Sequence, residues 1–168
     1  MGTEARVTTH KFSVPMTRGL SQLTLAILKP DVQRFTVYQQ YVESKMRESD
    51  LTVVCHGVFR LSKCQAQSFY EEHKGRFYYD RLVNHMITGS LGVYVLRGPD
   101  AISRWRSLLG LTKVYKAVVL DPDSLRGMLG LTDTRNGFHG SDSPVTALRE
   151  IRFFFPTFNL EISVISVG

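Results

Sequence analysis

The sequence predicts a single α+β domain built around an antiparallel sheet. Short apolar or β-branched runs alternate with helical stretches, the last strand is a brief run just before His139, and no internal repeat interrupts this order. The resulting order is typical of the ferredoxin-like βαββαβ fold, an antiparallel sheet with helices on one face. With 168 residues, 43% of them hydrophobic, one such domain can bury a substantial core.

The first half of the chain predicts two strands and the helix that joins them. Residues 23–28 form a short apolar run, which indicates a buried strand ending at the Lys-Pro-Asp turn of 29–31. Apolar residues at helical spacing predict a helix over about 36–48. Residues 51–61 are rich in β-branched side chains and predict the second strand.

The next stretch predicts three helices and one strand. Helical patterns cover 62–73 and 77–88, and they are separated by the Lys-Gly-Arg sequence at 74–76. Residues 90–98 alternate in polarity and predict a strand, which a Gly-Pro pair ends. A helix over 100–109 follows, with its apolar side chains on one side.

The last third predicts a long loop and a well-signalled helix. Residues 110–138 have several glycines and little periodicity, so we expect a loop with one turn of helix near 122–129. A loop of this length in a small domain usually serves function. Ser143 suits the N-cap and Pro144 the first helical position, so a helix should start there and run to about Phe155.

Composition and charge narrow the possible partners. The formal net charge of +6 favours an anionic partner, either nucleic acid, an acidic membrane or a phosphorylated small molecule. The cations are spread along the chain without a basic run, which argues against nucleic acid. No apolar run approaches the roughly 18 residues of a membrane span. The two cysteines, Cys55 and Cys64, match no metal-binding spacing, and we expect no protein-bound metal cluster.

Residues 1–22 differ from the rest, and we expect the domain itself to occupy 23–168. The segment has three cations, one acid and several Ser and Thr, without the apolar stretch of a secretory signal. This composition fits a basic, flexible leader that targets mitochondria. The alternative is a leader without a targeting signal, which would leave the protein in the cytoplasm. The sequence leaves both interpretations open.

His139 has the most suggestive setting of the five histidines. It lies between a short β-like segment and a helix start, within the run Asn-Gly-Phe-His-Gly-Ser-Asp-Ser at 136–143. Gly140 permits a turn and the close approach of a ligand, and the helix that starts at Ser143 directs N–H groups and partial positive charge toward the turn. Such a histidine suits proton transfer or attack on phosphorus. For His10, His56, His73 and His85, the sequence favours a surface or packing role.

Phosphate recognition here must rely on side chains. The sequence has neither the GxxxxGK(S/T) phosphate loop nor a GxGxxG fingerprint. Lys29 at the end of the first strand, Arg106 on the 100–109 helix and Arg126 in the long loop are candidates. Arginine offers a planar fork to phosphate oxygens and lysine a point charge, although each cation alone is more typical of a solvated surface charge.

Two of these motifs together resemble the nucleoside diphosphate kinase family. They are Lys-Pro-Asp at 29–31 after an apolar strand and Asn-x-x-His-Gly-Ser-Asp-Ser at 136–143. The resemblance covers about 23–156, and the sequence Gly-Leu-Thr-Asp-Thr-Arg-Asn at 130–136 is most similar to the divergent group II branch, closest to its type 6 members. The family's ferredoxin-like fold agrees with the prediction from the pattern of elements.

The resemblance implies a ping-pong phosphotransfer from ATP to nucleoside diphosphates, with Mg²⁺ bridging the phosphates as cofactor. By motif, His139 is the phosphorylated nucleophile, and Lys29 contacts the transferring phosphate. Tyr70 and Glu150 correspond to the pair that orients the histidine, with Ser141 in support. The implied nucleotide-binding residues are Lys29, Tyr78 (base stacking), Arg106, Thr112, Arg126 and Asn136.

Two departures from the family pattern leave an alternative open. The segment from Thr112 to Arg126 is about three residues longer than usual, in the loop that makes subunit contacts in family hexamers, so a hexamer is in doubt here. Asp133 is found where a small apolar residue is commoner, and it could weaken base packing. The alternative is a weakly active or inactive member that acts as a nucleotide-binding or scaffold protein with a protein partner.

Overall fold

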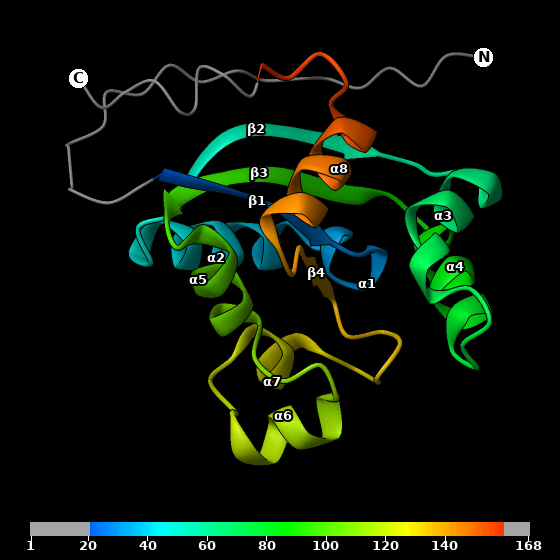
Figure 1. The fold of residues 1–168 in the computed structure, drawn as a ribbon. Helices are drawn as coiled ribbons and strands as arrows, with labels where there is room; N and C mark the ends of the chain where they lie inside the picture. Colours follow the sequence, from blue (N-terminus) through cyan, green and yellow to red (C-terminus); the bar gives the residue numbers. More distant parts are fainter. Residues whose placement is uncertain (1–20, 160–168) are drawn as a thin grey trace.

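The computed structural model describes residues 21–159, which form one four-stranded sheet with helices on both faces (Figure 1). The strands are β1 (Ser21–Leu28), β2 (Thr52–Phe59), β3 (Leu91–Pro99) and β4 (Phe138–Gly140). Their order across the sheet is β2-β3-β1-β4, and every neighbouring pair is antiparallel. The long central strands β1 and β3 pair along their whole length, so the short β4 lies against a rigid neighbour.

Two crossover connections give the ferredoxin-like topology. Helix α2 (Thr36–Glu48) connects β1 to β2, and α5 (Ala101–Leu109) with the excursion after it connects β3 to β4. The predicted fold class is therefore confirmed, and the predicted strands agree with the observed ones to within about two residues at most ends.

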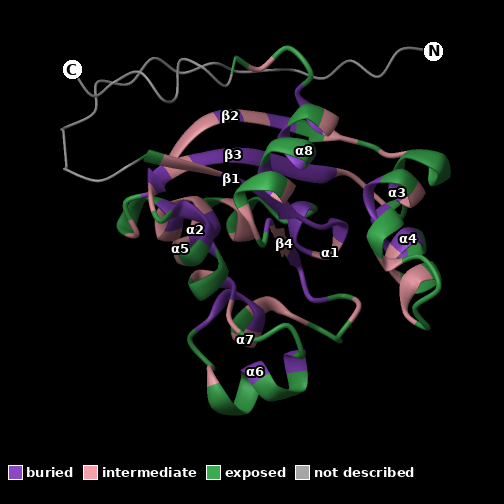
Figure 2. Ribbon diagram, in the orientation of Figure 1, coloured by how far each residue is buried: buried purple, intermediate pink, exposed green. Residues whose placement is uncertain are grey.

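The prediction of helices on one face holds only for the two crossover helices. They lie on one face with the four-residue α1 (Pro30–Gln33), whereas α3 (Lys63–Phe69), α4 (Tyr79–Met86) and α8 (Pro144–Phe154) cover the other. Figure 2 shows the sheet buried between them. Strand periodicity explains the two cores, because Leu25 and Ile27 point to one face while Ala26 and Leu28 point to the other.

The segment that the sequence predicted as a loop contains two short helices. They are α6 (Val114–Leu120) and α7 (Leu125–Leu129), and only α7 corresponds to the expected helical turn near 122–129. Helix α6 buries just Val114 and Ala117, so the apolar residues on its outer side hide the helical period. Figure 1 shows both helices projecting beyond α5, away from the sheet.

The helix starts that the sequence predicted near 62 and 143 have direct physical causes. Ser143 accepts a hydrogen bond from the Thr146 amide and Pro144 occupies the first turn, as expected for α8. Ser62 and Gln65 form a reciprocal capping box at the start of α3. A short 3₁₀ turn, η1 (Glu71–His73), then leads toward α4.

The described residues do not reach most of the predicted leader. Of residues 1–22, only Ser21 and Gln22 are described, and both belong to β1, so the targeting prediction lies outside the described part. Within residues 21–159, no helix has the length and apolar character needed to cross a bilayer.

Candidate active site

Strand β4 fixes the position of His139. It pairs with β1 so that His139 is opposite Ile27, in the fully buried last part of that strand. The His139 carbonyl also accepts a 3.0 Å hydrogen bond from the indole Nε1 of Trp105 on α5. A Cβ on Gly140 would approach that indole to 2.6 Å. The sequence suggested that Gly140 admits a ligand, but the group that it admits is the Trp105 ring.

Glu150 on α8 orients the imidazole. Its Oε1 lies 2.9 Å from Nε2 of His139, and its Oε2 accepts a 2.6 Å hydrogen bond from the Ser141 hydroxyl. Ser141 is in turn held by the backbone of Leu25, whose amide donates to Oγ at 3.2 Å. A carboxylate on Nε2 keeps the proton on that nitrogen, which leaves the lone pair of the neutral ring on Nδ1. Both predicted supporting roles, of Glu150 and Ser141, thus have a geometric basis.

The Glu150 carboxylate remains ionised although it is buried. Burial alone would raise the pKa of Glu150, but the His139 charge and hydrogen bonds from His139 and Ser141 outweigh it and lower that pKa. Its ionised form therefore stabilises the folded state at neutral pH, and this contribution is lost only as the pH falls below the usual range of a glutamate.

Aromatic rings from α3 and its C-terminal end surround the other sides of the imidazole. Phe69 contacts the His139 ring edge-on at 5.2 Å between centroids, and Tyr70 does so at 6.2 Å. Burial raises the pKa of Tyr70, and its hydroxyl is buried without a hydrogen-bond partner in the structure. Tyr70 therefore confines His139 through its ring, while its hydroxyl remains available to another group.

Lys29 is a buried cation at the end of β1. Its Nζ donates a 2.8 Å hydrogen bond to Oδ1 of Asn136, and its amide donates to the Gly137 carbonyl. Gly137 has a φ of +79°, and this conformation brings the strand of His139 against the Lys29 turn. Burial and the positive charge of Arg126 lower the pKa of Lys29 to about 8, against the opposing effect of Asp31. An anion bound here would stabilise the charged form of Lys29 and raise its pKa again.

Arg126 on α7 is the second buried cation. Its guanidinium donates to the carbonyls of Gly110 at 3.0 Å and Phe138 at 3.4 Å, while Nε is buried without a partner in the structure. Burial and the nearby charge of Arg106 lower its pKa to about 10, so Arg126 is still charged at neutral pH. The proximity of two positive charges, Arg106 and Arg126, and the unpaired Nε–H of Arg126 destabilise the folded state. A bound anion would offset both effects.

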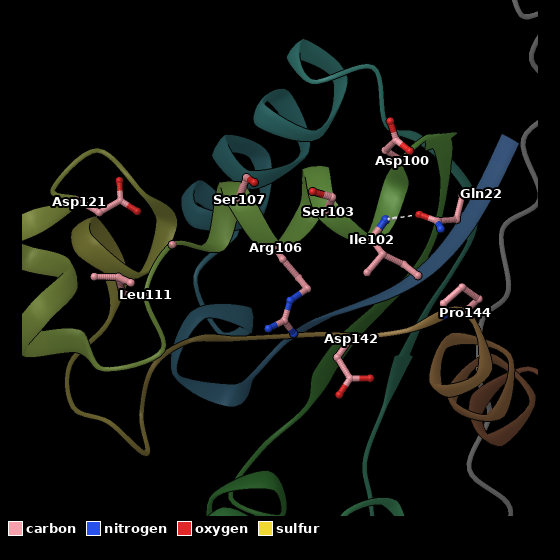
Figure 3. Close-up of a pocket in the computed structure, with 11 residues that line it drawn as sticks. Gln22, Asp100, Ile102, Ser103, Arg106, Ser107, Leu111, Asp121, Asp142 and Pro144 are labelled. Atoms are coloured by element: carbon pink, nitrogen blue, oxygen red, sulfur yellow. Dashed lines mark hydrogen bonds between the residues drawn. The ribbon is translucent and has the colours of Figure 1, made fainter. Parts of the chain in front are cut away.

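Arg106 is exposed on α5 and faces a surface pocket of about 810 Å³ (Figure 3). In the close-up its guanidinium extends toward the loop of Asp142, between α5 and the start of α8. Arg106 is the only sequence-predicted site residue among those lining the pocket, so this pocket is beside the His139 site and not over it. Its lining residues are Gln22, Asp100, Ile102, Ser103, Arg106, Ser107, Gly110, Leu111, Asp121, Asp142 and Pro144.

Asn136 connects the two ends of the 110–137 excursion. Its Nδ2 donates to the carbonyls of Thr112 at 3.4 Å and Asp133 at 3.3 Å, and its Oδ1 receives Lys29. Thr112 itself is exposed, so its hydroxyl is open to solvent or ligand. The predicted residues Lys29, Thr112 and Asn136 therefore form one connected group next to His139.

Tyr78 is at the start of α4 and joins the site through aromatic contacts. Its hydroxyl lies 3.2 Å from Nδ1 of His73, whose ring is 5.8 Å from the Tyr70 ring. Tyr70 in turn borders His139. Tyr78 is thus linked to His139 through His73 and Tyr70, and the predicted stacking of a base on its ring stays a prediction.

The sequence did not reveal a buried, hydrogen-bonded histidine–aspartate pair beside the site. Nε2 of His85 on α4 lies 2.9 Å from Oδ1 of Asp31, and both side chains are almost fully buried. Oδ2 of Asp31 is buried without a partner in the structure. The pair joins α4 to the turn that carries Lys29, and neither its separation of 54 residues nor the local pattern of His85 signals it.

Replacing His85 by leucine should therefore destabilise the fold. The change leaves the Asp31 carboxylate buried with neither oxygen paired, which costs about 3–5 kcal/mol. We expect the free energy of unfolding in urea to fall by that amount. The double variant His85→Leu/Asp31→Leu should recover most of it, since no buried charge remains. If the single variant unfolds like the wild type, the pair is not an important source of stability.

The fold and the site define a class: a ferredoxin-like domain with a carboxylate-oriented histidine on its short edge strand and buried cations around it. Residues 22–160 match the family model described as nucleoside diphosphate kinase. The chain belongs to the nucleoside diphosphate kinase family.

Curated relatives point to one branch of the family. The chain is 48% identical to "Nucleoside diphosphate kinase 6" of Xenopus tropicalis, over 82% of this chain and 77% of the relative. It is 46% identical to the Homo sapiens protein of that name, over 82% and 74%. A bacterial nucleoside diphosphate kinase, from Ehrlichia ruminantium, is 40% identical over 82% of this chain and 93% of the relative. These similarities confirm the resemblance drawn from the motifs.

Solved structures of the family share the fold. The Aquifex aeolicus nucleoside diphosphate kinase superposes with a TM-score of 0.73 at 32% identity, covering 80% of this chain and 95% of that one. The enzyme from Encephalitozoon cuniculi has a TM-score of 0.74 at 22% identity, covering 80% and 88%, and this likeness concerns the fold alone.

Proposed function

We propose that this protein is a nucleoside diphosphate kinase that transfers the terminal phosphate of ATP to nucleoside diphosphates through phosphohistidine at His139. The observation that carries the proposal is the Glu150 carboxylate on Nε2, which leaves Nδ1 as the nucleophilic nitrogen. The unpartnered buried donors, the Tyr70 hydroxyl and Nε of Arg126, support it because a phosphoryl group is the kind of ligand that would satisfy them.

In the first half of the reaction, the Nδ1 lone pair attacks the γ-phosphorus of ATP. A nitrogen–phosphorus bond forms, the bond to the β,γ-bridging oxygen breaks, and ADP leaves with that electron pair. In the second half, a terminal phosphate oxygen of the acceptor diphosphate attacks the same phosphorus and the histidine is released. Lys29, Arg126 and Arg106 supply fixed positive charge to the phosphates throughout, which is the main requirement of phosphoryl transfer.

The nucleotide would be held by residues that the site already groups together. Asn136 and Thr112 lie beside Lys29 and suit the sugar and phosphate hydroxyls and oxygens. The Tyr78 ring, at the start of α4, offers a face on which any base can stack. We expect broad acceptance of nucleotides, since stacking does not distinguish bases.

Mg²⁺ is proposed to arrive with the nucleotide. Within residues 21–159, no group of three or more His, Cys, Asp or Glu side chains is arranged to hold a metal ion. Mg²⁺ is commonly bound through substrate phosphates with few protein ligands, so the donor set fits a metal–nucleotide complex as substrate. When bound, the ion neutralises charge on the phosphates.

The test of this proposal is transfer in two separate halves. Purified protein is incubated with ATP labelled at the γ-phosphate and Mg²⁺, freed of nucleotide, and then given an unlabelled nucleoside diphosphate. We expect label on the chain that is stable to alkali and lost in acid, followed by its appearance in the triphosphate. Folded protein that never acquires acid-labile label would contradict the proposal.

Glu150→Gln should lower the turnover number while leaving the KM for nucleotide nearly unchanged. A glutamine amide can donate to Nε2, which favours the tautomer with the proton on Nδ1 and blocks the lone pair there. By analogy with amide replacement of a histidine-orienting carboxylate, the loss should be on the order of 10²-fold or more. Glu72→Gln is the matched control, because Glu72 is exposed and pairs with Arg149 at the surface. Equal rates for both variants would exclude an orienting role.

A scaffold or nucleotide-binding role is the second candidate, and one feature favours it. Helix α6 exposes Val118, Val119 and Leu120 in succession, at 51%, 75% and 71% of their surface, as residues of an interaction surface do. These residues are in the segment that is longer than the family pattern, so we propose that assembly here differs from the family hexamer. If His139→Ala fully supports the cellular role, binding alone is the function.

A further inference from the structure

The excursion between α5 and β4 has to be closed at its base for the proposed site to exist. Thr112 is near its beginning and Asn136 near its end, and α6 and α7 lie between them (Figure 1). One hydrogen bond of the Asn136 amide joins the two ends, to the Thr112 carbonyl, and the other is local, to the Asp133 carbonyl three residues earlier. Both exceed 3.2 Å, so these bonds alone give a weak closure.

The Asp133 side chain adds a second bond across the same base. Its Oδ1 accepts a 3.1 Å hydrogen bond from the amide of Val114, the first residue of α6. The N-cap residue of α6 is Lys113, whose side chain has donors only and makes no cap. The first turn of α6 therefore depends on a carboxylate 19 residues away in sequence.

The local conformation around Asp133 favours this contact. The Leu131 and Thr132 amides both donate to the Arg135 carbonyl, and the Thr132 hydroxyl accepts from the Arg135 amide. This compact turn holds the Asp133 carbonyl toward Asn136 while its carboxylate extends to α6. One residue thus bonds both to α6 and to the side chain that holds Lys29.

We propose that Asp133 is a positioning residue for nucleotide binding, which clasps α6 to the Asn136 turn and so places Thr112 and Asn136 beside Lys29. This rests on the proposed function of the site. It also revises the expectation that Asp133 weakens base packing, because the carboxylate is engaged with the backbone of α6. Asp133 does not touch the reacting atoms, so its effect should fall on binding.

The experiment compares Asp133→Ala with Asp133→Asn. Asparagine retains an oxygen that can accept from Val114, whereas alanine does not. We expect Asp133→Ala to raise the KM and the Kd for ADP by about three- to thirtyfold, as loss of a helix cap implies, with the turnover number within about twofold of wild type. Asp133→Asn should stay within about twofold of wild type in both. Asp123→Ala is the control, since Asp123 is exposed on the same excursion.

Several results would overturn the proposal. They are an unchanged Kd in Asp133→Ala, equal losses in the alanine and asparagine variants, or a loss confined to turnover. The Kd for ADP is measured without turnover, so the clasp can be tested even if phosphotransfer fails. If Asp133→Ala does not fold, hydrogen exchange of the Val114 amide in Asp133→Asn and wild type decides, and rapid exchange in both contradicts the clasp.

Discussion

His139→Asn is expected to abolish acid-labile phosphorylation and to lower triphosphate formation by a factor on the order of 10⁴ or more, as removal of a covalent nucleophile does. Asparagine offers no basic nitrogen to attack phosphorus. The Glu150 carboxylate keeps its hydrogen bond from the Ser141 hydroxyl, so it is not left without a partner and the fold should persist. Nucleotide binding should also persist, because Lys29, Arg126 and Asn136 are unchanged. The measurement is the two-step label transfer together with the Kd for ADP.

His56→Asn serves as the matched control for this variant. His56 stacks on Tyr94 at 4.3 Å in β2, and neither residue belongs to the proposed site. We expect it to retain both label and transfer. A His139→Asn protein that still forms acid-labile phosphate would place the nucleophile on another histidine and remove the basis of the mechanism.

Lys29→Met should make the protein more stable and far less active. Methionine fills a similar volume without a charge, whereas the buried ammonium is penalised, as its pKa of about 8 shows. The shift from 10.5 corresponds to a few kcal/mol, and the lost bond to Asn136 offsets part of it, so we expect a gain of about 1–3 kcal/mol at pH 7. Transfer should fall by about 10²- to 10³-fold, the usual effect of removing one preorganised donor to the transition state.

The pH dependence of stability provides an independent check on Lys29. The unfolded chain binds more protons than the folded chain between the folded pKa of about 8 and the ordinary value of 10.5. The free energy of unfolding of the wild type should therefore rise with pH through this window, and Lys29→Met should lack that rise. Lys63→Met, at an exposed position on α3, is the control. A Lys29→Met protein of lower stability with an unchanged pH slope would contradict the argument.

Most of the fold could be predicted because local signals and tertiary packing agree. The strand at 23–28 is a short apolar run and the strand at 90–98 has an alternating pattern, and both form the centre of the sheet. The Ser143-Pro144 helix start is set by a local hydrogen bond. Helix α6 was not predicted because only two of its residues are buried and its cap comes from Asp133, far along the chain. The helices on the second face of the sheet were not predicted, because the pattern of side chains along a strand does not show which element covers each face.

The same distinction between local and long-range signals applies to the candidate site. His139, Lys29, Arg126 and Asn136 could be named from motifs, since their chemistry and spacing carry the resemblance. Their long-range partners could not. The edge contact of Phe69, the His85–Asp31 pair and the engagement of Gly140 with Trp105 depend on which elements meet across the sheet. The local sequence of either partner does not determine these contacts.

The hydrogen bond between Trp105 and the His139 carbonyl has a practical consequence. Trp105 is the only tryptophan in the chain, and it is fully buried with its indole N–H on the backbone of the proposed nucleophile. Fluorescence excited where tyrosine does not absorb thus comes from one indole attached to β4. We therefore expect the emission of the unlabelled wild-type protein to report events at His139, and stopped-flow fluorescence can be used to follow each of the two proposed half-reactions.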